Sequence, residues 1–295
     1  MMDYKSIICG MIFMEVYMEF KNEQNYKNCK NAFTLAEVLI TLGIIGVVAA
    51  MTLPTLIANY QKQVYVNQLK KTVSVVDNGL KLIPSIEGVS EFSQTQIANM
   101  IEDSDKTARG LSETDAFFNL VDTDFKKAFK VVKSYKNSEV NALNSVGSSF
   151  VTDKKTCQNN VGKTYNIVYK LKNKEACISD TAGIVFELAD GSYLDFKPWP
   201  KGEVSRPTER IIAEIKFDTN GFKGPNMAGY DYFAFLLLKN GKLIPAGGKA
   251  WGAAIYPDHP DGYYMIGFDC KTDGSSYTSL GCAARIMENG WKMDY

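Results

Sequence analysis

The strongest hydrophobic pattern in the chain lies near its N-terminus, where residues 38–57 form an almost uninterrupted apolar run. Between Lys30 and Lys62 the sequence contains no basic residue and a single acid, Glu37. A helix of about 20 apolar residues spans the hydrocarbon core of a bilayer. The run therefore predicts one transmembrane helix.

The charges that flank this run predict its orientation. Lysines stand shortly before it at Lys21, Lys27 and Lys30. Positive residues are enriched on the cytoplasmic side of membrane helices, so we expect a cytoplasmic N-terminus and an exported chain after Tyr60. Three further lysines follow the run and weaken this asymmetry, at Lys62, Lys70 and Lys71.

Helical spacing of apolar residues continues beyond the apolar run. The apolar positions recur mostly every three or four residues, at Val64, Val66, Leu69, Val73, Val76, Leu80 and Ile83. We therefore expect one long helix, with residues 33–57 in the membrane and residues 58–84 packing an apolar stripe into a globular head. Pro54 is expected to bend or loosen this helix, and Pro84 to end it.

The remaining residues, 85–295, change from helical to strand-like patterns. Helices are expected around residues 94–101 and over 113–132. Strands are expected at 165–169, 184–188, 192–196, 211–217, 232–238 and 242–245. Asp190-Gly191 and Asn240-Gly241 favour tight hairpin turns between strands. This order predicts an α+β fold, with a long N-terminal helix against an antiparallel sheet.

Charge and motifs narrow the classes of function. Lys plus Arg and Asp plus Glu both number 33, so no global field favours a nucleic-acid partner. The sequence has no Walker motif, no nucleophile elbow and no dinucleotide fingerprint. Its sole histidine, His259, lies in a polar stretch typical of a loop. We therefore expect neither enzyme activity nor nucleic-acid binding.

A compact motif stands at the start of the apolar run. Ala32 precedes Phe33, and Glu37 lies four residues after Phe33. An ordinary secretory signal would instead be cut after its apolar core, near Ala49 and Ala50, but that alternative leaves the long preceding segment and the acid unexplained. A plain signal anchor is a second alternative, and it does not explain these details either.

This motif resembles the processing signal of type IV pilins and type II secretion pseudopilins. The resemblance implies that a prepilin peptidase removes residues 1–32 by cutting between Ala32 and Phe33, and that the new amino group of Phe33 is methylated. The family usually has Gly where this chain has Ala32. Pro54 stands where the family has its helix-bending proline, and a pilin-like head packs its sheet against the long helix.

The same resemblance implies a structural subunit, major or minor, of a type IV pilus or type II secretion filament. Before assembly, such a subunit spans the cytoplasmic (inner) membrane once, with its head on the periplasmic or extracellular side. An inner-membrane platform then assembles it with other subunits into the filament. Glu37 would then meet the amino group of Phe33 in an adjacent subunit, because a membrane-embedded acid needs a partner. Gly43 and Gly46 would allow close helix approach. The alternative class is a monomeric, signal-anchored, exported binding domain.

Two further features concern the head. After cleavage four of the six cysteines remain, Cys157, Cys177, Cys270 and Cys282. Export favours disulfides, and nearest-neighbour pairing would join Cys157 to Cys177 and Cys270 to Cys282, although four cysteines allow three connectivities. The C-terminal bridge would resemble the disulfide-bounded loop of many pilins.

A Gly-rich stretch carries oxygen donors of the kind that calcium prefers, at Asp218, Asn220, Asn226 and Asp231. It resembles loops of the major type II secretion pseudopilin and its relatives, some of which hold calcium. The spacing is not that of an EF-hand, and Asn and Asp are also common turn residues. Calcium is the only cofactor that the sequence suggests.

Overall fold

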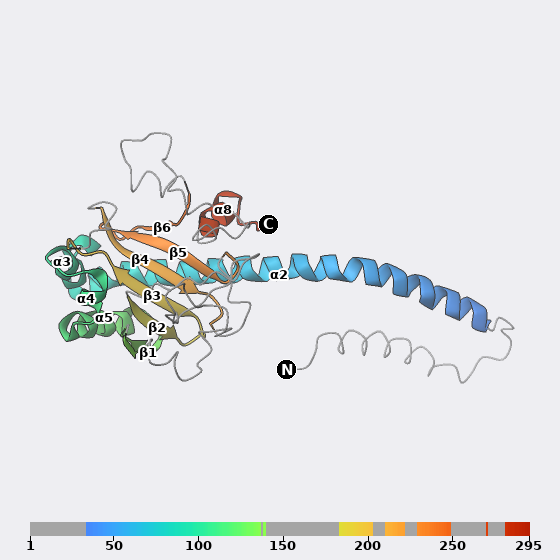
Figure 1. Cartoon of the computed structure of the whole chain (residues 1–295), viewed down its shortest axis with the longest axis horizontal. Coiled ribbons are helices and arrows are strands. Elements are labelled where there is room, and N and C mark those ends of the chain that lie inside the picture. The colour runs from blue at the N-terminus through green and yellow to red at the C-terminus, as the bar shows by residue number, and fades with distance from the viewer. Residues whose placement is uncertain are drawn as a thin grey trace, which may run out of the picture. The chain divides into compact units, whose positions relative to one another are not determined.

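The computed structural model describes residues 34–136, 138–139, 183–202, 210–221, 229–248, 270 and 281–295. The chain divides into two compact units, Met1–Ile57 and Ala58–Tyr295. Its longest element is the helix α2, Leu35–Glu87, which continues without a break through Pro54 (Figure 1).

The end of α2 differs from the expectation, because the helix passes Pro84 and ends at Glu87. Gly88 is the residue that ends it, with a positive φ of 73° that glycine adopts without strain. The N–H of Val89 donates to the oxygen of Pro84 at 2.9 Å and so satisfies a terminal carbonyl. Pro84 is itself buried in the last turn.

Short helical elements follow α2 in the order η1 (Phe92–Gln94), α3 (Gln96–Glu102), α4 (Ala108–Ser112) and α5 (Asp115–Ala128). Thr95 begins α3 as its N-cap, and its Oγ1 accepts from the N–H of Ala98 at 3.1 Å. The helix expected over 113–132 is too long at its C-terminal end. Phe129 is already extended, at φ −127°, and Val131 starts a strand.

In the described part of the chain, six antiparallel strands form one sheet and lie in it in chain order (Figure 1). The strands are β1 (Val131–Tyr135), β2 (Ile184–Leu188), β3 (Tyr193–Pro198), β4 (Ile211–Asp218), β5 (Tyr232–Leu238) and β6 (Leu243–Pro245). Gly191 and Gly241 supply the positive φ of the expected tight turns, at 83° and 79°. The strand expected at 165–169 lies outside the described residues. The α+β class, with a long N-terminal helix and an antiparallel sheet, is confirmed.

One face of the sheet and the second half of α2 share a hydrophobic core. The helix contributes a fully buried stripe, which includes Leu69, Val76, Leu80 and Ile83. The sheet contributes mainly large apolar side chains, among them Phe186, Phe196, Ile215, Phe217, Phe233 and Phe235. Phe125 of α5 stacks on Phe186 with ring centroids 4.7 Å apart, which ties the helical layer to the same core.

Candidate assembly site

The first half of α2 presents an apolar surface that no described residue covers. Leu35 is 81% exposed and Met51 is 74% exposed. The other large exposed side chains are Val38, Leu39, Ile40, Leu42, Ile44, Ile45, Val47, Val48, Leu56 and Ile57. By length and composition this helix could cross a membrane. Because water disfavours so much apolar surface, residues 35–57 need lipid or other helices around them.

Glu37 takes part in a capping box at the start of this helix. Thr34 is the N-cap, and its N–H and Oγ1 donate to Glu37 Oε2 at 2.9 and 3.0 Å. The N–H of Glu37 lies 3.3 Å from Thr34 Oγ1 in return. This role of Glu37 was not predicted from the sequence, although the spacing Thr-x-x-Glu is typical of a capping box. Glu37 therefore stabilises the helix start, whatever else it binds.

The helix face around Gly43 and Gly46, where close approach of another helix is expected, is open. A Cβ placed on Gly43 or Gly46 would meet no atom within 4 Å. The hydroxyl of Thr41 donates to the oxygen of Val38 and that of Thr52 to the oxygen of Val48, both at 3.0 Å. The hydroxyls of Thr41 and Thr52 are thus satisfied within the helix, as a membrane or a helix bundle requires. Ala32 and Phe33, the expected cleavage site, lie outside the described residues.

Three of the four expected calcium ligands, Asp218, Asn220 and Asp231, lie together where β4 ends and β5 begins. Asp218 Oδ1 accepts from the N–H groups of Asn220 and Gly221, at 3.2 and 2.8 Å. The side chain of Asn220 donates from Nδ2 to Asp231 Oδ2 at 3.3 Å. Asp218 and Asp231 are 4% and 0% exposed, so two buried carboxyls stand at this turn. Asn226 lies outside the described residues.

The electrostatics of this turn favour a positive partner. Burial and the neighbouring charge of Asp231 together raise the pKa of Asp218 to about 8, against the lowering effect of the Asn220 and Gly221 N–H groups. Thr219 Oγ1 and Asn220 Oδ1 are buried and meet no hydrogen-bond partner in the described part of the chain. Within that part there is no group of three or more His, Cys, Asp or Glu side chains that could hold a metal ion. The turn therefore offers two carboxyls and two neutral oxygens.

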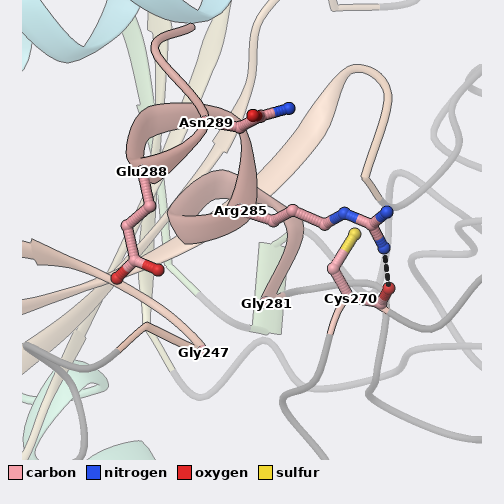
Figure 2. A pocket seen from close by; sticks show the side chains of 6 residues that line it. All are labelled: Gly247, Cys270, Gly281, Arg285, Glu288 and Asn289. Atoms are coloured by element: carbon pink, nitrogen blue, oxygen red, sulfur yellow. Dashed lines mark hydrogen bonds between the residues drawn. The ribbon is translucent and has the colours of Figure 1, made fainter. Parts of the chain in front are cut away.

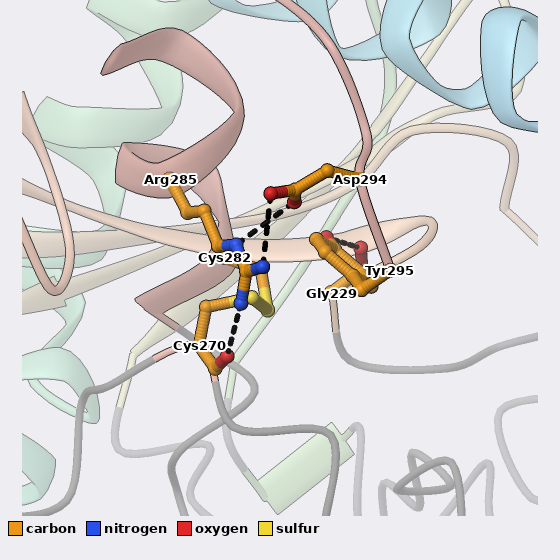
Figure 3. The surroundings of a disulfide bond; sticks show 6 residues. All are labelled: Gly229, Cys270, Cys282, Arg285, Asp294 and Tyr295. Carbon is orange, nitrogen blue, oxygen red and sulfur yellow. Dashed lines mark hydrogen bonds and ion pairs between the residues drawn. A yellow bond between two sulfur atoms is a disulfide. The ribbon is translucent and has the colours of Figure 1, made fainter. Parts of the chain in front are cut away.

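The C-terminal segment is fastened to the head at several points (Figure 3). A disulfide joins Cys270 to Cys282, at the start of α8 (Cys282–Glu288). Arg285 donates from Nε and Nη2 to the two oxygens of Asp294, at 2.8 and 2.9 Å. The phenol of Tyr295 donates to the oxygen of Gly229 at 2.5 Å. Cys157 and Cys177 lie outside the described residues.

Contacts between aromatic rings connect the C-terminal segment to the long helix α2. The ring of Tyr295 meets that of Tyr230 edge-on, with centroids 5.7 Å apart. Tyr230 in turn meets Tyr65 of α2 at 5.8 Å. The Nζ of Lys70 lies 5.4 Å from the ring centroid of Trp291. The C-terminus therefore braces the part of α2 that enters the head.

A shallow cavity of about 390 Å³ opens beside the disulfide. Its lining consists of Gly247, Cys270, Gly281, Arg285, Glu288 and Asn289. In Figure 2 the Arg285 side chain turns toward the backbone oxygen of Cys270, to which its Nη1 donates at 3.2 Å, and away from Glu288. Because the guanidinium also binds Asp294, the described residues that line this cavity include no uncommitted cation to recognise an anion.

Comparison with known proteins gives one match. Residues 27–53 match the family model of the prokaryotic N-terminal methylation motif. No curated protein and no solved structure matches the chain. The matched residues contain the expected cleavage site, Glu37 and most of the apolar run. This motif is the prepilin signature of type IV pilins and pseudopilins.

Proposed function

We propose that this chain, which carries the prepilin signature, is a structural subunit of a type IV pilus or a type II secretion filament. One observation carries the proposal. The methylation motif at residues 27–53 includes the start of a helix whose residues 35–57 expose an apolar surface. The signature belongs to structural subunits and not to enzymes, so the function proposed is assembly.

Processing comes first in the proposed mechanism. A prepilin peptidase cuts between Ala32 and Phe33, removes residues 1–32 and leaves Phe33 to be methylated. The apolar run after Phe33 keeps the mature subunit in the inner membrane, with residues 58–295 on the outer side. The order of leader, cut and apolar helix means that cleavage leaves the membrane anchor intact.

Assembly then exchanges lipid for neighbouring helices. The exposed side chains of residues 35–57 stay in apolar surroundings in both states, so moving from bilayer to filament core need not expose them to water. Gly43 and Gly46 leave room for another helix backbone to approach. Lipid tails are as apolar as these side chains, so the hydrophobic effect does not draw helices together in a bilayer. Close van der Waals packing at the small residues would supply the attraction instead.

Glu37 links processing to assembly in this mechanism. Its Oε2 is held by Thr34, and its Oε1 accepts no hydrogen bond from the described residues. Cleavage creates a positive amino group on Phe33, one residue before the N-cap. In the filament, Glu37 of one subunit pairs with that amino group of the next, which neutralises both charges and fixes the axial step.

A second proposal concerns the turn between β4 and β5. We propose that Asp218, Asn220, Asn226 and Asp231 hold a calcium ion. The support is the pair of buried carboxyls together with the buried oxygens of Thr219 and Asn220, to which no described residue donates a hydrogen bond. Calcium accepts six to eight oxygen ligands of mixed type, and carboxylates supply the charge it needs. The ion would brace the segment that touches α2 through Tyr230 and Tyr65.

The test of the main proposal is whether the chain enters filaments. The full chain is expressed with a prepilin peptidase and an assembly platform, and filaments sheared from the cells are probed for it. We expect the processed subunit in the sheared fraction. If the chain instead stays in the membrane as a folded monomer and is absent from the sheared filaments, the proposal is wrong. The alternative, a monomeric signal-anchored binding domain, then replaces it.

A further inference from the structure

The C-terminal end of α2 brings a carboxyl group between two other helices. Glu87 is the last residue of α2, and its Oε2 accepts from the N–H of Gln96 at 2.5 Å. The N–H of Ile97 is also hydrogen-bonded to this carboxyl. Both donors belong to the first turn of α3, so Glu87 ties the end of α2 to the start of α3.

A second carboxyl approaches the same place from α5. Asp124 is 4% exposed and lies next to Phe125, which is fully buried. Its Oδ1 lies 3.6 Å from the Nζ of Lys127, the only charged partner that the described residues give it besides Glu87. Glu87 therefore has one oxygen that accepts a hydrogen bond, Asp124 has one oxygen in an ion pair, and each carboxyl has a second oxygen without such a contact.

The two remaining oxygens, Glu87 Oε1 and Asp124 Oδ2, are both buried. Neither meets a donor within the described ranges. The side chains of Glu87 and Asp124 nevertheless lie within hydrogen-bonding reach of each other. Ionised carboxylates can only accept hydrogen bonds, so two of them side by side would repel and leave both oxygens unsatisfied. One proton between them removes both penalties.

The surroundings of the pair favour retention of that proton. Burial raises the pKa of Glu87, and the charge of Asp124 and the hydrogen bond to it raise it further, against the lowering effect of the Gln96 and Ile97 N–H groups. Other charged groups on these helices are engaged elsewhere. Lys81 binds Asp77, Lys126 binds Asp122, and Glu102 binds Lys239.

We propose that Glu87 and Asp124 share one proton in the folded head, and that losing it as the pH rises loosens the junction of α2, α3 and α5. The junction thereby acts as a pH-sensitive contact, firmer in mildly acidic surroundings than in alkaline ones. Because α2 is also the helix proposed to assemble, the pair makes the rigidity of the head around its buried end depend on pH. This inference does not depend on filament formation.

The direction of the effect follows from proton linkage. A carboxyl whose folded pKa is raised binds more protons in the folded state than in the unfolded state. Its contribution is fully present below the unfolded value, about 4.3 for Glu, and is lost as the pH passes the raised folded value. The unfolding equilibrium constant should rise by up to roughly tenfold for each unit by which the folded pKa is raised.

The variant Glu87→Gln separates the proton from the rest of the contact. Its amide oxygen can still accept from Gln96, and its amide N–H can donate to Asp124 Oδ2 at any pH. Denaturant unfolding of the full chain in detergent is compared at about pH 5 and about pH 8. We expect the wild-type midpoint to fall between these values and the Glu87→Gln midpoint to fall clearly less.

The matched control is Asp103→Asn, which removes an exposed carboxylate from the end of α3. This control should keep the full wild-type dependence on pH. Equal dependence in wild type and Glu87→Gln would overturn the proposal.

A second measurement decides the matter if the variant does not fold. The infrared band of a protonated carboxylic acid is recorded near neutral pH on the Asp218→Asn chain, because the buried Asp218 carboxyl, whose pKa is raised, would give a band of its own. We expect the band in Asp218→Asn and in the double variant Asp218→Asn, Asp103→Asn. Its absence from the folded Asp218→Asn chain would show that Glu87 and Asp124 are both ionised and would overturn the proposal.

Discussion

The ring of Phe129 occupies the space that a side chain on Gly79 would need. A Cβ on Gly79 would collide with the Cε1, Cζ and Cδ1 atoms of that ring. Phe129 is 5% exposed and packs on Phe125, with ring centroids 5.1 Å apart. The missing side chain at position 79 therefore sets how closely the start of the sheet approaches α2.

The first prediction follows from this contact. Gly79→Ala should destabilise the head by about 1–3 kcal/mol, because the new methyl group forces the Phe129 ring out of its place in a packed core. This packing cost outweighs the helix propensity gained by replacing Gly with Ala. Chemical unfolding of the full chain in detergent measures the change. The matched control is Gly43→Ala, also a helical glycine, where a Cβ meets nothing and head stability should stay unchanged. Equal effects of the two variants would contradict the packing described.

The second prediction separates the two roles of Glu37. Glu37→Ala removes both the capping box and the charge, so it should spare cleavage and strongly reduce incorporation into filaments. Thr34→Ala removes only the capping partner and leaves the carboxylate free to pair with an adjacent amino group. It should therefore assemble nearly as the wild type does. The amounts of processed and sheared protein measure both steps.

Normal filament incorporation of Glu37→Ala would remove this carboxylate from the assembly mechanism. If Thr34→Ala assembled as poorly as Glu37→Ala, capping alone would account for the loss. The two variants together thus distinguish helix stabilisation from pairing between subunits.

The third prediction concerns the C-terminal disulfide. Replacing Cys270 and Cys282 together by Ala should cost about 3 kcal/mol of stability, because the bond closes a loop with a sequence separation of 12. The loss should be visible as a lower unfolding midpoint in the full chain. Treatment with a reductant should then lower the midpoint of the double variant less than that of the wild type. An unchanged midpoint in the variant would show that Arg285, Asp294 and Tyr295 hold the segment without the bond.

The fourth prediction tests the proposed calcium ion. Added calcium should raise the unfolding midpoint of the wild-type chain, and equimolar magnesium should raise it less, because the turn offers mixed oxygen ligands without strict octahedral order. Asp218→Asn removes one of the two charges and should abolish the shift. Asp103→Asn, an exposed carboxylate elsewhere in the head, should retain it. A calcium-independent midpoint in the wild type would exclude the site.

The sequence predicted the sheet well where local chemistry determines it. The bounds of β2 and β5 agree with the expected 184–188 and 232–238, because β-branched and aromatic residues are bounded there by Asp-Gly and Asn-Gly turns. It failed at β1, since Phe129 and Val132 are three residues apart and fit a helix as well as a strand. Only pairing with β2 makes Val131–Tyr135 extended. The short helix α8 was likewise not predicted.

Among the site residues, those determined by local sequence were predictable, and those brought together only by tertiary packing were not. The apolar run was readable because hydropathy needs no tertiary structure, and Asp218 and Asp231 were readable because one hairpin brings them together. Glu87 and Asp124 were not. They lie on different helices, and only the packing of α2, α3 and α5 places their carboxyls side by side. No local pattern reports such a pair.

The most direct test of the central claim is the mass and N-terminal residue of the mature chain, isolated from cells that contain a prepilin peptidase. The account predicts a chain that begins at methylated Phe33 and lacks Lys27 and Lys30. A mature chain that retains these lysines, or one that begins after Ala50, would contradict it.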